Sequence, residues 1–300
     1  MATMIHAATA QQLSRYIDVA SFAVLVYDHL VTLDLEVSLI WPTPWNITKS
    51  FYLLSRYSPF LDAINAIYHQ PINNIGPKEC RVSYSIAGWL FMFGICLSEV
   101  ILSFRTWAVW GRDRRLTIGL PVFLFAAWAP IIFFTWRFLH SLHFTQTPYT
   151  SVIGCFVDHA DPILFYSWVM LMIYEAGLMA LMAIRGYNVY RTGGNSALFN
   201  VVYRDGILYY VYLFSISLIN VVLVNTLGPE YSFLLSGMER VAHSILASRV
   251  ILHIRDQARR NPLDPDTLTW ASRADNSNQV MLPIRFSRPS TESPKTPYSP

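Results

Sequence analysis

The chain has 300 residues, of which 53% are hydrophobic and only 14% are charged. Soluble domains carry charge on about a quarter of their residues, so this composition excludes an ordinary soluble globular protein. The net charge is +3, which the basic cytoplasmic loops of a membrane protein account for, so we expect no nucleic acid partner. Three cysteines are too few for a disulfide framework, although they allow one bridge.

Seven apolar segments follow one another along the chain. They cover about residues 16–40, 49–69, 82–110, 116–138, 162–184, 205–227 and 231–253, each near the roughly 20 residues that a membrane-spanning helix needs. Proline and glycine separate many of them, such as Pro42 and Pro44 after the first segment and Gly228-Pro229 before the last. We therefore predict an all-α fold, a seven-transmembrane-helix bundle of receptor-like topology over residues 1–255, with the lipid bilayer as its main partner.

The last part of the chain, residues 256–300, has a different composition. It is rich in proline, serine and charged residues, and it offers little apolar surface to offset the entropy lost on ordering. This composition predicts a disordered cytoplasmic tail. Ser-Pro and Thr-Pro pairs leave a second interpretation open, a tail regulated by phosphorylation.

Arginine residues are concentrated in alternate loops, which predicts the orientation of the helices. Basic clusters follow the third, fifth and seventh segments, whereas residues 139–161 contain no lysine or arginine. Basic loops are retained in the cytoplasm, so we predict an outer N-terminus and a cytoplasmic C-terminus, in the plasma membrane. A small ligand would then bind at the outer face, and a cytoplasmic protein partner would bind the basic loops.

Polar side chains inside the apolar segments are the candidate functional residues, because each costs several kcal/mol in the bilayer unless it is paired or hydrated. We expect Arg56 to pair with Asp28 or Asp34. We also expect the side chains of the third and seventh helices to face the interior. Such a set forms either an ion-pair lattice that fixes helix register or a ligand site or ion path, and both interpretations stay open. The candidates are Asp28, Arg56, Glu99, Arg105, Glu175, Glu239, Arg240 and His243.

Two cysteines fall on the predicted outer side. Cys80 lies at the start of the third segment and Cys155 lies in the loop after the fourth, so we predict a disulfide between them and a free Cys96. The placement resembles the bridge of G-protein-coupled receptors. The chain lacks their acidic-Arg-aromatic triplet and their Asn-Pro-x-x-Tyr motif, so this likeness is one of architecture alone.

The sequence offers little for metal-dependent catalysis. An intramembrane zinc hydrolase needs about three nitrogen or oxygen ligands on one metal, which His29, Glu239 and His243 could at best supply. No His-x-x-x-His or His-Glu-x-x-His spacing accompanies them. We therefore predict no metal, no cofactor and no enzymatic activity, with an intramembrane metal hydrolase as the least favoured alternative.

The first two segments contain a distinctive series of residues. They are Tyr27-Asp28-His29, Thr32-Leu33-Asp34, Glu36, Ile40-Trp41 and Arg56-Tyr57, with scattered further matches such as Cys80, Glu99, Glu175 and Ser248-Arg249. This series resembles an uncharacterised family of multi-pass membrane proteins of mushroom-forming fungi, catalogued as a domain of unknown function. The likeness is strongest over about residues 16–62. It implies a multi-helix membrane protein and carries no reaction, ligand or catalytic residue.

Two classes of function remain for such a bundle. A receptor-like or sensing protein should have an outward pocket, an intact bundle and a basic cytoplasmic surface. A transporter or channel for a small polar solute or ion should have broken helices that meet in mid-membrane and a continuous polar path. We favour the receptor-like class by analogy of fold.

Overall fold

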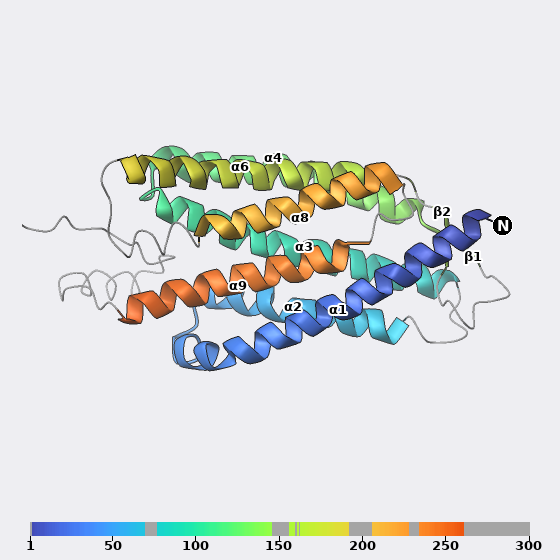
Figure 1. Cartoon of the computed structure of the whole chain (residues 1–300), viewed down its shortest axis with the longest axis horizontal. Coiled ribbons are helices and arrows are strands. Elements are labelled where there is room, and N and C mark those ends of the chain that lie inside the picture. The colour runs from blue at the N-terminus through green and yellow to red at the C-terminus, as the bar shows by residue number, and fades with distance from the viewer. Residues whose placement is uncertain are drawn as a thin grey trace, which may run out of the picture.

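A computed structural model describes residues 2–69, 77–145, 156–159, 161, 163–191, 206–227 and 234–260. Within these residues, seven helices run roughly along one axis and form an elongated bundle (Figure 1). They correspond one by one to the seven predicted segments. The helices are α1 (Ala2–Leu39), α2 (Ile47–His69), α3 (Pro77–Val109), α4 (Arg114–Ser141), α6 (Leu164–Arg191), α8 (Gly206–Leu227) and α9 (Ser236–Arg260).

The predicted bounds are least accurate at the polar ends of the helices. α1 begins at Ala2, because good helix formers extend the helix beyond its apolar part. α9 begins later than predicted, at Ser236, and runs to Arg260, past the predicted end of the bundle at residue 255. The rest of the predicted tail, residues 261–300, lies outside the described residues, so its disorder stays a prediction.

A short pair of strands lies between α4 and α6 and was not predicted. β1 (His143–Thr145) pairs antiparallel with β2 (Phe156–His159), with Phe144 opposite Val157. Strands this short carry too little alternation to be recognised in a sequence. β1 packs against the start of α3, where the rings of Phe144 and Tyr84 lie 5.1 Å apart.

Apolar side chains cover much of the outside of the bundle. On α4, for example, Ile118 is 71% exposed and Phe125 is 72% exposed. Of the helices in the described part of the chain, α1, α3, α4, α6 and α8 are long and apolar enough to cross a membrane. These helices mark the chain as a multi-pass membrane protein. α2 and α9 are outside this group because they are less apolar along their length.

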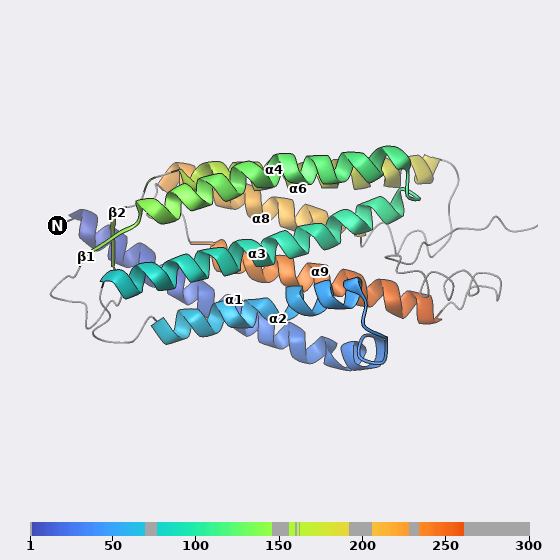
Figure 2. The same ribbon diagram turned by 180° about the vertical axis from the view of Figure 1, so that it is seen from behind.

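α3 lies in the middle of the bundle and contacts α2, α4, α6 and α9. α1, α2 and α9 pack together on one side of it, and α4, α6 and α8 pack on the other (Figures 1 and 2). The N-terminus, β1 and β2 lie at one end of the bundle. Because α3 borders both groups of helices, a polar residue on α3 can meet partners from distant parts of the chain.

A tight turn joins α3 to α4. Gly111 and Arg112 adopt left-handed backbone conformations, with φ of 67° and 60°. Asp113 then caps α4, since its side chain accepts a hydrogen bond from the backbone N–H of Arg115 at 3.0 Å. The turn reverses the chain within a few residues and places the basic segment at the end of the bundle opposite β1.

Candidate functional site

α1 has a polar stripe that faces inward. Asp28, Thr32 and Glu36 are each four residues apart, so they share one face of the helix, and all three are buried. Tyr27 and Leu30 lie on the other side and are 66% and 65% exposed. α1 is therefore polar inside and apolar outside, the reverse of a helix on a soluble protein.

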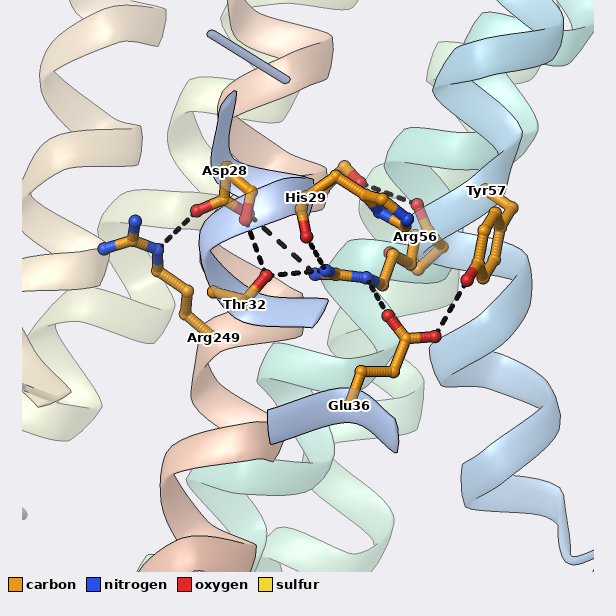
Figure 3. Close-up of polar contacts among 9 residues, drawn as sticks. Asp28, His29, Thr32, Glu36, Arg56, Tyr57 and Arg249 are labelled. Carbon is orange, nitrogen blue, oxygen red and sulfur yellow. Dashed lines mark hydrogen bonds and ion pairs between the residues drawn. The ribbon is translucent and has the colours of Figure 1, made fainter. Parts of the chain in front are cut away.

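Arg56 of α2 lies among these three side chains (Figure 3). Its Nε forms an ion pair with Glu36 Oε2 at 2.6 Å, and its Nη2 donates to Thr32 Oγ1 at 2.6 Å. Its Nη1 lies 3.9 Å from Asp28 Oδ2. Arg249 of α9 donates from Nε to Asp28 Oδ1 at 2.6 Å. We call Asp28, Thr32, Glu36, Arg56 and Arg249 the α1–α2–α9 network.

The sequence predicted only part of this network. Asp28 does lie beside Arg56, but the closest carboxylate is that of Glu36, which was not among the predicted partners. The other predicted partner, Asp34, is exposed on the opposite face of α1. The spacing of 28, 32 and 36 was the available signal for Glu36. Arg249 was named only as a match to the resembled family; its side chain is 44% exposed and lies at the edge of the network.

A second ion pair joins α9 to α2 across the edge of α3. Arg240 Nε lies 3.1 Å from Asp62 Oδ2, and Arg240 Nη2 donates to Ser58 Oγ at 2.5 Å. The guanidinium packs directly on Gly94 of α3, at the position where any other residue would carry Cβ. Gly94 is therefore required at this crossing because only a glycine leaves room for Arg240.

Arg105 lies apart from the other predicted site residues. It is buried near the start of α8, where its guanidinium stands 5.6 Å from the ring of Tyr209 and packs against Gly206. This contact joins α3 to α8. It places Arg105 toward the end of the bundle that holds the α3–α4 turn.

The remaining predicted residues meet at the centre of the bundle. His243 Nδ1 lies 3.4 Å from Glu99 Oε1, and His243 Nε2 lies 3.0 Å from Glu175 Oε1. All three side chains are fully buried or nearly so. We call Glu99, Glu175 and His243 the central cluster; they come from α3, α6 and α9.

Glu239 lies one turn before His243 on α9 and is also buried. Its carboxylate accepts hydrogen bonds from Ser217 Oγ at 2.7 Å and Asn220 Nδ2 at 2.8 Å, both on α8. His29, which the sequence had grouped with Glu239 and His243 as a ligand set, lies elsewhere. Its ring contacts Tyr57 and Phe60, at centroid distances of 5.3 and 5.4 Å. His29 therefore does not join Glu239 and His243 in the set that an intramembrane zinc hydrolase would have needed.

A cavity of about 210 Å³ lies between α3, α4 and α6, in the half of the bundle that holds β1. Its walls are almost entirely apolar, yet three of the side chains that line it carry buried hydrogen-bond donors. Among the described residues, Trp128 Nε1, Trp168 Nε1 and Ser167 Oγ have no partner. Other lining residues include Tyr84, Phe91, Ile95, Thr135, Phe138 and Leu171. We call this cavity the pocket.

The pocket was not predicted from the sequence. Aromatic residues at helical spacing give the same sequence pattern whether their side chains pack against a neighbouring helix or line a cavity. Its position relative to the central cluster follows from helix geometry. Ile95 and Leu171 line the pocket, and Glu99 and Glu175 follow them by four residues, one helical turn along the same faces. The central cluster therefore lies about one turn from the pocket, deeper in the bundle.

Two cysteines are described. Cys80 is buried at the start of α3 and is disulfide-bonded, and Cys96 is free and half-buried. Cys155, the predicted partner of Cys80, lies outside the described residues. That pairing stays a prediction.

The comparison with known proteins bears on the N-terminal helices. No curated protein and no solved structure matches the chain. One family model, described as a family of unknown function (DUF6533), matches residues 16–61. This range agrees with the 16–62 over which the sequence resemblance is strongest, while the fungal origin stays a prediction. The part of the chain that contains Asp28, Glu36 and Arg56 is thus similar to a family whose function is unknown.

Proposed function

We propose that this multi-pass membrane protein is receptor-like and binds a small, mainly apolar molecule in the pocket. The three unpartnered donors on Trp128, Trp168 and Ser167 are the observation that carries this proposal. A buried donor without an acceptor is costly, and a carbonyl, ether or hydroxyl oxygen of a ligand would relieve that cost. The apolar walls would contact the rest of the molecule. The volume of about 210 Å³ exceeds the roughly 150 Å³ that holds benzene in an apolar core.

Two features of the bundle favour a receptor-like protein over a transporter or channel. The helices of the described residues are each continuous, with no break at mid-length. Their buried charges form separate groups instead of one path. We keep the expectation that the protein is not an enzyme.

We further propose seven crossings with an outer N-terminus, a cytoplasmic C-terminus and a plasma membrane location, because the arginine-rich loops all fall at the same predicted end. Epitope tags at either end of the chain test this orientation. On intact cells, antibody should label the N-terminal tag, and it should label the C-terminal tag only after permeabilisation. Labelling of the C-terminal tag on intact cells would contradict the orientation. The pocket would then lie in the cytoplasmic half of the bundle.

Acetophenone and ethylbenzene form a matched pair of probes for the pocket, since they share a ring and differ in a carbonyl acceptor. We expect acetophenone to bind the protein in lipid nanodiscs about five- to tenfold more tightly, as one hydrogen bond to a buried donor implies. Ligand-observed NMR titration measures both affinities. The difference should shrink in Trp168→Phe, which keeps an aromatic wall and removes the indole donor.

Ser167→Phe should abolish binding of both probes by filling the pocket. Val122→Phe adds the same ring on the outer side of α4, where Val122 is 61% exposed, and should leave binding unchanged. Equal affinity for the two probes would show that the donors do not select the ligand. Undiminished binding to a folded Ser167→Phe variant would place the ligand elsewhere.

A further inference from the structure

We infer that Glu99, Glu175 and His243 form a binding site for one divalent transition-metal ion, with Zn²⁺ as the best fit. The site lies where α3, α6 and α9 meet, and it is independent of the ligand proposed for the pocket. A metal ion there would tie together three helices that come from distant parts of the chain.

The donor atoms are already close together. One carboxylate oxygen from each glutamate and one ring nitrogen of His243 lie within 4.8 Å of one another. Among the described residues, no hydrogen bond from outside the central cluster reaches the carboxylate oxygens of Glu99 and Glu175 or the ring nitrogens of His243, which contact one another at 3.0 and 3.4 Å. Three donor atoms, one from each residue, therefore border one small buried volume. Buried polar atoms are nearly always satisfied, so the arrangement indicates an occupant.

The charge of the central cluster indicates a cation. Glu99 and Glu175 together carry a formal charge of −2 when ionised, and within the described residues no lysine or arginine forms an ion pair with them. Arg240, the nearest arginine along α9, pairs with Asp62 instead. A protonated His243 would offset one of the two charges. A divalent ion would offset both and leave the imidazole neutral, which is the form that binds metals.

The chemistry of the donors selects the class of ion. Two carboxylate oxygens and one imidazole nitrogen suit Zn²⁺ and its neighbours Co²⁺, Fe²⁺ and Mn²⁺. Ca²⁺ takes about six to eight oxygen ligands, far more than this cluster supplies. Zinc is commonly held by about three protein ligands with a further position left for water. The central cluster matches that number.

Metal content measures the site directly. The protein, purified with a tag free of histidine, equilibrated with Zn²⁺ and desalted, should carry about one zinc per chain by elemental mass spectrometry. Glu99→Gln, Glu175→Gln and His243→Gln should each bind zinc at least about tenfold more weakly. Glu239→Gln is the matched control, because Glu239 is equally buried but its carboxylate accepts hydrogen bonds from Ser217 and Asn220, and it should keep the metal. Chelation should lower the Tm of the wild-type protein, and added Zn²⁺ should restore it.

A variant that gains an absorption band tests whether residue 99 is a metal ligand. In Glu99→Cys, bound Co²⁺ should show an intense thiolate-to-cobalt absorption band that the wild-type protein lacks. The wild-type measurements decide the matter even if a variant fails to fold. A wild-type protein that binds no zinc after equilibration overturns the inference, and the cluster is then an imidazolium held between carboxylates. Full zinc content in the folded variants of all three residues also overturns it, since the metal then lies elsewhere.

Discussion

Replacing Arg56 with methionine is expected to cost about 3–5 kcal/mol of folding free energy, which is the usual penalty for removing one partner of a buried ion pair. Methionine fills a similar volume, so the loss comes from charge and not from a cavity. Glu36 is fully buried and would lose the ion pair at 2.6 Å. Asp28 would suffer less, because Arg249 still donates to it at 2.6 Å. We therefore expect Arg56→Met to leave little folded protein in the membrane.

Thermal melting of a fluorescent fusion, followed by size-exclusion chromatography, measures this loss. The double variant Arg56→Met/Glu36→Met removes both members of the ion pair, so no buried carboxylate is left at position 36. It should recover much of the stability. Asp34→Asn is the control on the same helix and should melt like the wild type, since Asp34 is exposed. If Arg56→Met and the double variant melt alike, the Arg56–Glu36 pair is not the source of the stability.

Gly94→Ala is expected to destabilise the protein by about 3 kcal/mol, a large effect for one added methyl group. The new Cβ would overlap the guanidinium of Arg240 and force it away from Asp62 and Ser58. Gly119→Ala on α4 is the matched control, because nothing lies within 4 Å of the Cβ that it would add. That change should be neutral, or stabilising by about 0.5–1 kcal/mol through helix propensity.

The double-mutant cycle with Arg240→Met isolates the cause. Once the guanidinium is gone, the added methyl group has nothing to displace. Gly94→Ala should therefore cost much less in the Arg240→Met background than in the wild type, as measured by the same thermal melting. Equal cost in both backgrounds would assign the effect to α3 itself.

The helices were predictable because each membrane-spanning helix needs an apolar run as long as the bilayer core is thick. This requirement applies to each segment on its own, so it can be read from the local sequence. Their ends were less predictable, since α1 and α9 continue as helices through polar residues. The inward stripe on α1 could also be read from its spacing of four residues. These features are local, and a sequence records local features directly.

The partners of the buried charges were not predictable in the same way. Arg240 and Asp62 are 178 residues apart, and the central cluster draws Glu99, Glu175 and His243 from three helices. Helical periodicity tells which face of a helix is polar, but it does not tell which other helix lies against that face. His29, for example, faces Tyr57 and Phe60 of α2, whereas Glu239 and His243 on α9 face α8, α3 and α6, so these three residues do not come together.

The bond between Asp28 and Arg249 ties the first helix to the last, across 221 residues of chain. A ribosome that delivers helices to the membrane in order will release α1 and α2 long before α9 exists. Through that interval Arg56 is the only basic member of the α1–α2–α9 network within the emerging pair, and it faces the two carboxylates of Asp28 and Glu36. Before α9 is made, the network residues of the α1–α2 hairpin therefore carry a net negative charge in the bilayer. Cellular quality control that recognises unpaired charge inside the membrane should therefore remove chains that stop before α9. In complete chains, Arg249 neutralises this charge.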